Sequence, residues 1–239
     1  MSLSLLTTVL LASAAMADEA WDTKEVREVQ ARFGECVIKR HYQTARQFVL
    51  APNLDEKDYQ RAASKVADGY CLVKASESSR GVEMKFPADT MRYALADALV
   101  QREFSAGPVS TFANSAPLEK VKFDEKEHQP KPGKKLKPAE LKELEEHKAK
   151  HLVAIFLAGF GECVVRAEPV QSHSLLMTKP GSSEENAAFA ALRSRFGNCI
   201  VTGQTLSFSK TALRGTIAMN YYRLAHAPRI AATPAGASK

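Results

Sequence analysis

The sequence predicts an all-α protein built from two tandem, disulfide-stapled helical repeats of about three helices each. Apolar residues recur at intervals of three and four, as on the buried face of a helix, and no long run alternates apolar with polar residues. The motif Phe-Gly-Glu-Cys-Val occurs twice, at 33–37 and at 160–164. Four cysteines fall as one pair in each half. A chain of 239 residues, 45% apolar and 25% charged, is long enough for such a core and is not collagen-like, wholly disordered or multi-span.

Residues 1–17 are predicted to be a cleavable signal peptide. The stretch 3–17 carries no charge and is shorter than the ~20 residues needed to span a bilayer. It ends in Ala15-Met16-Ala17, the small-x-small pattern of a signal peptidase site, so we expect cleavage after Ala17 and a periplasmic protein. A buried N-terminal helix is the alternative. No later segment is apolar enough to cross a membrane, so the mature chain is expected to have no transmembrane segment.

The first repeat, 18–104, reads as helical throughout. Its first helix is expected to begin at Asp22, with Glu25 completing the cap. A short helical segment at 45–50, a helix at 58–73 and a last helix after Pro87 follow. The buried face of the first helix is formed by five residues with helical spacing: Val26, Val29, Phe33, Cys36 and Val37.

The second repeat, 139–227, follows the same order. The first motif recurs at an offset of 127 residues, the Gly-x-Cys-x-Val pattern at 128, and the Phe…Arg…Ala pattern of the last helix at 122. A short segment at 172–177 and a helix at 185–201 precede a last helix with Ser209 as its N-cap. Between the repeats lies a Pro/Lys-rich linker, 105–138, and residues 228–239 are expected to form a disordered tail.

The cysteines are predicted to form two local disulfides, Cys36–Cys71 and Cys163–Cys199. The pairs enclose 34 and 35 residues, and the duplication favours bridging within each copy. Redox catalysis and zinc binding are the alternatives, but they favour closely spaced pairs, which this sequence lacks.

Two charged residues also recur: Glu35 and Arg92 in the first copy match Glu162 and Arg214 in the second. The structural interpretation is an ion pair between two helices of each repeat, which would fix their packing. The functional alternative is an acid or an anion clamp in a cleft. No nucleophile accompanies these residues, and no catalytic residue is predicted.

A basic run in the linker contains Lys131, Lys134, Lys135 and Lys137. A solvated linker is the favoured interpretation, and binding to an anionic surface is the alternative. Nucleic acid is not expected as a partner, because no aromatic residues are interleaved with the lysines.

No metal site or cofactor is predicted. Glu143, His147 and His151 lie four residues apart and would share one side of a helix, but the surrounding Lys and Glu indicate a solvated surface. A Gly-rich phosphate-binding loop is absent from the sequence.

The sequence resembles uncharacterised exported proteins of sphingomonad-type alphaproteobacteria. The resemblance is carried by four segments: Phe160-Gly-Glu-Cys-Val-Val-Arg166, Leu175-Leu-Met, Gly203-Gln-Thr-Leu-Ser-Phe208 and Ala212-Leu-Arg-Gly-Thr-Ile217. It implies a Gram-negative periplasmic location and no known activity.

We therefore expect a non-enzymatic periplasmic module that binds an unknown protein or envelope component, with the groove between the repeats as the natural site. A periplasmic enzyme with Glu and Arg in a cleft is one alternative. A binder of anionic envelope polymers through the Lys-rich linker is the other. The sequence leaves the oligomeric state open.

Overall fold

The computed structural model describes residues 22–52, 54, 56–77, 88–120, 129–130, 136–200 and 208–230. These residues form nine α-helices and one short 3₁₀ helix, and they contain no β-strand, which confirms the all-α prediction. One isolated bridge joins Ser115 to Arg229. The expected signal peptide, 1–17, lies outside the described residues.

The first half of the chain contains five helices: α2 (Lys24–Arg40), α3 (Tyr42–Leu50), α4 (Glu56–Val66), α5 (Gly69–Ser76) and α6 (Ala88–Glu103). The single helix expected at 58–73 is therefore divided in two. The division falls at Asp68, whose side chain accepts hydrogen bonds from the backbone N–H groups of Tyr70 and Cys71 and so begins α5 as its N-cap.

The second half contains α7 (Pro138–Ala167), α8 (Pro169–Leu176), α9 (Ser183–Phe196), the 3₁₀ helix η2 (Gly197–Cys199) and α10 (Lys210–His226). The expected N-cap of the last helix is confirmed, because Ser209 Oγ accepts a hydrogen bond of 3.1 Å from the N–H of Ala212.

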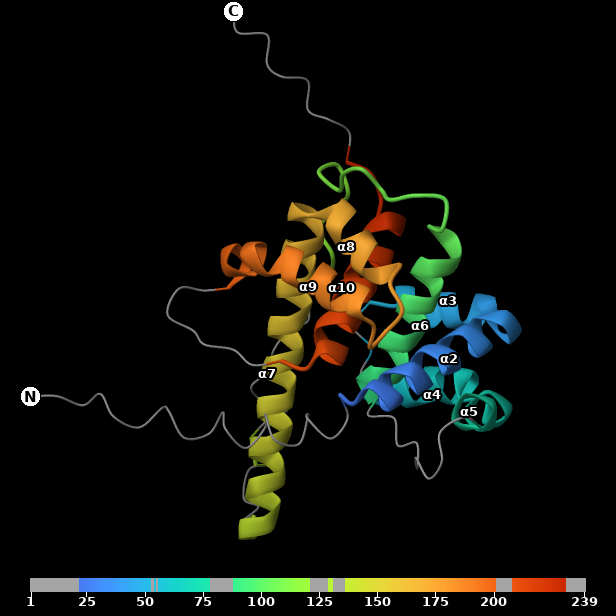
Figure 1. The fold of residues 1–239 in the computed structure, drawn as a ribbon. Helices are drawn as coiled ribbons and strands as arrows, with labels where there is room; N and C mark the ends of the chain where they lie inside the picture. Colours follow the sequence, from blue (N-terminus) through green and yellow to red (C-terminus); the bar gives the residue numbers. More distant parts are fainter. Residues whose placement is uncertain are drawn as a thin grey trace, which may run out of the picture.

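Helices α6 and α10 pack against each other at the centre of the protein (Figure 1). Helix α2 packs on α6, and α7 packs on α10. The short helices follow the same order, since α3 contacts α6 and α8 contacts α10. One continuous apolar core joins both halves, with Phe33, Leu95 and Leu99 from the first and Tyr221 and Tyr222 from the second fully buried.

A glycine allows the two helices to cross closely in each half. A Cβ atom at Gly34 of α2 would lie 2.4 Å from the carbonyl oxygen of Ala94 in α6. A Cβ atom at Gly161 of α7 would lie 2.4 Å from the Asn220 amide nitrogen and 3.0 Å from the Thr216 carbonyl oxygen in α10. Any larger residue at these positions would push the helices apart.

Gly161→Ala is expected to destabilise the protein by about 1–3 kcal/mol, because the added methyl group would overpack the crossing of α7 and α10. Gly159→Ala, two residues away on the same helix, has no atom within 4 Å of the added Cβ. It should stabilise the protein by about 0.5–1 kcal/mol through helix propensity. Urea unfolding of the two variants measures both effects, and equal effects would contradict the close crossing.

The N-terminus of α2 differs from the expectation by one residue. Thr23, not Asp22, is the N-cap, since its hydroxyl accepts a hydrogen bond from the N–H of Val26. The carboxylate of Asp22 instead accepts from the N–H groups of Lys210 and Thr211, both at 2.9 Å, at the start of α10. A negative charge is favourable at a helix N-terminus, so Asp22 ties the two halves together.

The Ser/Ala/Pro-rich start of the linker, 105–118, lies against the second half of the protein. Phe112 is fully buried, and the N–H of Val109 donates a hydrogen bond of 2.8 Å to the Tyr221 hydroxyl. The N–H of Ile230 donates to the carbonyl oxygen of Asn114. These contacts fix residues 109–114 of the linker and the first residues of the C-terminal tail.

Candidate functional site

Both predicted disulfides are present. Cys36 on α2 is bonded to Cys71 on α5, and Cys163 on α7 is bonded to Cys199 in η2, with Cα–Cα distances of 5.5 and 5.7 Å. No cysteine is left free. Each bridge therefore joins the first helix of one half to the third helical segment after it.

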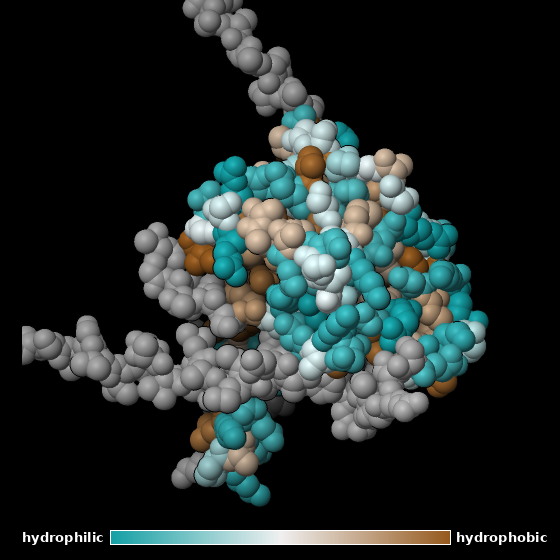
Figure 2. All heavy atoms as spheres, in the orientation of Figure 1, coloured by the Kyte–Doolittle hydropathy of each residue, from teal (hydrophilic) through white to brown (hydrophobic). Residues whose placement is uncertain are grey.

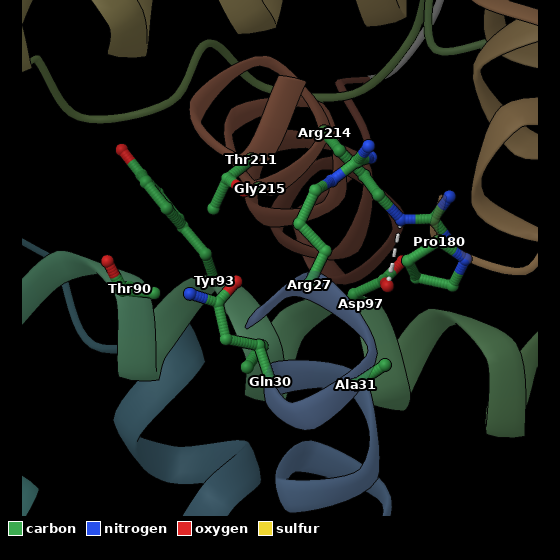
Figure 3. Close-up of a pocket in the computed structure, with 11 residues that line it drawn as sticks. Arg27, Gln30, Ala31, Thr90, Tyr93, Asp97, Pro180, Thr211, Arg214 and Gly215 are labelled. Carbon is green, nitrogen blue, oxygen red and sulfur yellow. Dashed lines mark hydrogen bonds and ion pairs between the residues drawn. The ribbon is translucent and has the colours of Figure 1, made fainter. Parts of the chain in front are cut away.

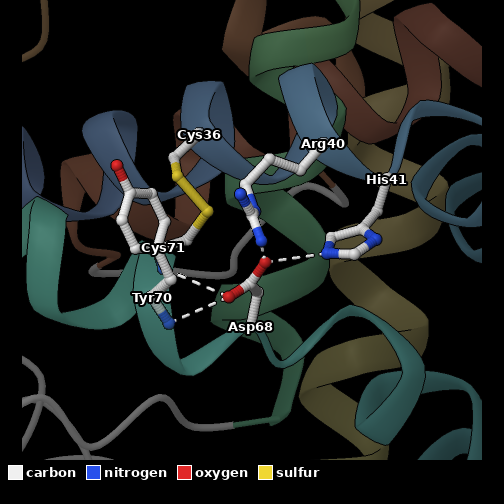
Figure 4. Close-up of a disulfide and its surroundings, with 6 residues drawn as sticks. All are labelled: Cys36, Arg40, His41, Asp68, Tyr70 and Cys71. Atoms are coloured by element: carbon white, nitrogen blue, oxygen red, sulfur yellow. Dashed lines mark hydrogen bonds and ion pairs between the residues drawn. A yellow bond between two sulfur atoms is a disulfide. The ribbon is translucent and has the colours of Figure 1, made fainter.

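A polar cluster surrounds the first disulfide (Figure 4). Arg40 Nε and His41 Nε2 both lie 2.7 Å from Asp68 Oδ2, and the Arg40 guanidinium lies 4.7 Å from the centre of the Tyr70 ring. The hydrogen bonds from Arg40 and His41, helped by the two N–H groups of α5, hold the pKa of Asp68 well below its usual 3.8. The cluster fixes the start of α5 beside Cys71.

This lowered pKa predicts a specific sensitivity to acid. A carboxylate whose pKa is lower in the folded state stabilises the protein above its unfolded-state pKa, and that stabilisation is lost as the pH falls below it. Asp68→Asn keeps a capping side chain but removes the charge. We expect the variant to melt at a lower temperature than the wild type at neutral pH, and the difference to shrink below pH 3.8. A constant difference across the pH range would contradict this assignment.

The structure does not bring the four charged residues together as expected. Glu162 pairs with Arg166 on the same helix, at 2.8 Å, and accepts a hydrogen bond from the N–H of Leu118 in the linker. Glu35 is exposed on α2. Arg214 does form a buried ion pair, but with Asp97 and Glu185. Glu35 and Glu162, the expected partners of the two arginines, lie on sides of their helices that do not face the interior.

Arg92 and Arg214 instead share a different set of contacts. Arg92 donates hydrogen bonds to the carbonyl oxygens of residues 48, 49 and 51, at the end of α3. Arg214 donates to those of residues 175, 176 and 178, at the end of α8. Each acceptor in the second set lies 127 positions after its counterpart in the first. Both arginines therefore satisfy the free carbonyl groups at the C-terminus of the matching short helix.

Four charged side chains from both halves meet in the interior beside Arg214. Arg27 of α2 and Asp97 of α6 come from the first half, and Glu185 of α9 and Arg214 come from the second. Arg214 binds Asp97 through two hydrogen bonds, of 3.0 and 3.1 Å, and its Nη1 lies 3.1 Å from Glu185 Oε1. Arg27 donates to the same oxygen of Glu185. All four residues are buried. Because this cluster links the two halves through ion pairs, we call it the charged joint.

Burial and the neighbouring charges shift the pKa values of Asp97 and Arg214 in opposite directions. Burial raises the pKa of the Asp97 carboxyl, although Arg214 acts against this effect. Burial also disfavours the charge on Arg214, but Asp97 and Glu185 outweigh it and raise the pKa of the guanidinium. The joint therefore depends on Arg214 remaining in place to neutralise two buried acids.

A small cleft with about 30 Å³ of space for water-sized molecules, partly open to solvent, lies between α2, α6 and α10 beside the charged cluster. Figure 3 shows Arg27, Asp97 and Arg214 on one side of it and Thr90 and Tyr93 on the other. The ring of Tyr93 packs directly on Gly215, and the amide of Gln30 adds a further polar group. No Cys, Ser or His is among the described residues lining this cleft.

No family model, curated protein or solved structure matches this chain. The geometry of the site is therefore the basis for any functional proposal.

Three residues of the charged joint were missed from the sequence. Asp97 had a signal, because it is the only polar residue in the apolar run 94–100. Arg27 and Glu185 had none: each lies in the first two turns of a helix, where charged residues are ordinarily solvated. Their burial follows from contacts between residues 158 positions apart.

The remaining candidates from the sequence lie only partly within the described residues. Lys137 is exposed at the start of α7, while Lys131, Lys134 and Lys135 lie outside the described residues. No three potential metal ligands converge in the described part of the chain, and no described helix is long and apolar enough to cross a membrane.

Proposed function

We propose that this protein is a non-enzymatic periplasmic module of two related helical repeats, which binds a partner at the cleft between its halves. The single observation that carries the proposal is the position of the cleft: it lies beside the charged joint, where the two halves meet. Clefts between domains or repeated units are common binding sites.

Matching contacts support the duplication. Arg92 and Arg214 bind carbonyl groups that differ by a constant offset, and Gly34 and Gly161 mark the same helix crossing in each half. The atoms opposite the two glycines also correspond, since residues 94 and 216 and residues 98 and 220 are each 122 positions apart. Two copies of one ancestral unit would produce both agreements.

An oxidising compartment is supported by the two disulfides, because such bonds persist mainly outside the cytosol. The uncharged leader at 1–17 and its small-x-small ending support export to the periplasm. Binding rather than catalysis is supported by the charged groups of the cleft, because Arg214 is engaged with Asp97 and Glu185.

Affinity capture from an envelope extract tests the proposal with a matched pair of variants. Gln30→Trp fills the cleft, while Glu35→Trp places the same side chain on an exposed position of the same helix. We expect a captured partner to be lost with Gln30→Trp and retained with Glu35→Trp. Capture that both variants retain would reject the cleft.

A deletion of residues 120–138 separates this proposal from binding through the Lys-rich linker. Partners that survive the deletion but not Gln30→Trp support the cleft. Partners that are lost with the deletion, and that are released by moderate salt, support an anionic envelope polymer as the ligand instead.

A further inference from the structure

The size of the cleft beside the charged joint limits what can enter it. Its space for water-sized molecules is about 30 Å³. One ordered water needs about 10–15 Å³ by the same measure, so the cleft has room for about two or three waters. A nucleotide, a sugar ring or an aromatic side chain is too large for this space. The group that enters is therefore a few heavy atoms long and belongs to a larger partner, which makes its other contacts outside the cleft.

The charged groups beside the cleft already compensate one another. Arg214 donates two hydrogen bonds to Asp97 and lies 3.1 Å from Glu185, to which Arg27 also donates. Asp22, 3.6 Å from Arg27, is balanced by the N-terminus of α10. An inserted ion would add an uncompensated charge to this balanced set, which is costly away from water. The charges therefore favour an uncharged group in the cleft.

Two uncharged polar side chains line the cleft, Gln30 of α2 and Thr90 of α6 (Figure 3). Both are half-buried, and neither forms a hydrogen bond with another residue in the described part of the chain. The Gln30 amide offers a donor and an acceptor, and the Thr90 hydroxyl can act as either. Ala31 and Ala94 add apolar surface to the lining. A group that satisfies the Gln30 amide must therefore both donate and accept.

A primary carboxamide matches the Gln30 amide on both counts. Its C=O and one N–H lie on the same edge, so two carboxamides can form a ring of two hydrogen bonds in which each donates once and accepts once. A trans secondary amide, as in a peptide backbone or an acetamido sugar, has its N–H and C=O on opposite edges and can form one of these bonds at a time. In proteins, primary carboxamides belong to the side chains of asparagine and glutamine.

We propose that the cleft receives the carboxamide of an asparagine or glutamine side chain of a partner protein, which pairs with the Gln30 amide through two hydrogen bonds. This inference rests on the proposed function and specifies which part of the partner enters the cleft. Figure 2 shows that the described residues on one face of the protein are mostly hydrophilic. A partner that contacts such a surface presents polar side chains, carboxamides among them.

Acetamide is the probe for the first test, because it is the carboxamide without the rest of the partner. Titration of the isotope-labelled full chain is followed by NMR at the side-chain N–H groups of Gln30 and at the backbone N–H of Gly215, which also lines the cleft. We expect saturable shifts with millimolar acetamide and at least fivefold weaker binding of N-methylacetamide, acetate and acetamidinium. Equal binding of all four probes, or a preference for N-methylacetamide, would overturn the proposal.

Three variants test the role of the Gln30 amide. Gln30→Leu removes the amide at similar size and should abolish the acetamide shift at Gly215, whereas Glu35→Leu, at an exposed position of the same helix, should keep it. Gln30→Glu keeps the shape but only accepts, so acetamidinium, which donates twice, should now bind at least fivefold more tightly than acetamide. A general loss of stability would not produce this exchange of preference. Retention of the acetamide preference in Gln30→Glu contradicts the pairing.

Failure of this inference can be distinguished from failure of the proposed function. If acetamide binds without selectivity while Gln30→Trp still abolishes capture of a partner, the carboxamide is rejected and the cleft is retained as the binding site. If acetamide binds selectively but Gln30→Trp retains the captured partner, the pairing with Gln30 holds for the isolated group and its assignment to that partner is rejected.

Discussion

Arg214→Ala is expected to lower the free energy of unfolding by about 3–5 kcal/mol, as when one partner of a buried charge pair is removed. The guanidinium satisfies the carboxylate of Asp97 and one oxygen of Glu185, and it binds three carbonyl groups at the end of α8. Without it, Glu185 keeps its contact with Arg27, whereas Asp97 loses both of its guanidinium hydrogen bonds. Urea unfolding measures this loss: the midpoint falls, while the slope of the unfolding free energy against urea concentration stays unchanged.

Arg92→Ala is the matched control for this prediction. Arg92 binds the corresponding carbonyl groups at the end of α3, but it is less buried than Arg214. We expect a loss of about 1–3 kcal/mol from unsatisfied carbonyl groups. The double variant Asp97→Leu/Arg214→Met should recover part of the larger loss, because it removes both members of one pair. If Arg214→Ala and Arg92→Ala lost equal stability, the buried acids beside Arg214 would not be the cause of the expected difference.

Removal of either disulfide is expected to cost about 4 kcal/mol, because each bridge closes a loop of similar length in the unfolded chain. The sequence separations are 35 residues for Cys36–Cys71 and 36 for Cys163–Cys199. Two double variants, Cys36→Ala/Cys71→Ala and Cys163→Ala/Cys199→Ala, should therefore lose nearly the same stability in urea. Loss of both bridges should leave little folded protein at physiological temperature.

Reduction of the wild type provides the control for the disulfide variants. Dithiothreitol removes both bonds without altering any side chain beyond sulfur, so it should reproduce the combined effect of the two double variants. A wild type that melts at the same temperature with and without reductant would contradict the prediction.

The sequence predicted those features that depend on local spacing. Helical periodicity identified the buried face around Phe33, and Ser209 was found as an N-cap because capping residues act within three positions of their own helix. The disulfides were paired correctly because each half repeats the same arrangement of cysteines.

Features that depend on which helices meet were not predicted. Recurrence of Glu162 and Arg214 suggested that they pair, but the packing of α6 on α10 brings Asp97 to Arg214 instead. Asp22 was assigned to its own helix, although its carboxylate reaches the start of α10, 188 positions away. The spacing of residues along one chain does not specify contacts between distant helices.

The contact between Tyr93 and Gly215 makes the interface between the two halves asymmetric. These positions match each other with the same offset of 122 that relates Arg92 to Arg214. In a symmetric pair of identical units, each would face its own copy, so two bulky rings would collide or two glycines would leave a hollow. Here a Cβ at Gly215 would lie within 2.4–2.6 Å of Tyr93. The side chain of Tyr93 therefore fills the space that Gly215 leaves by having no side chain. Each half therefore packs better against the other half than it would against a second copy of itself. The two halves can differ in this way because one chain contains both.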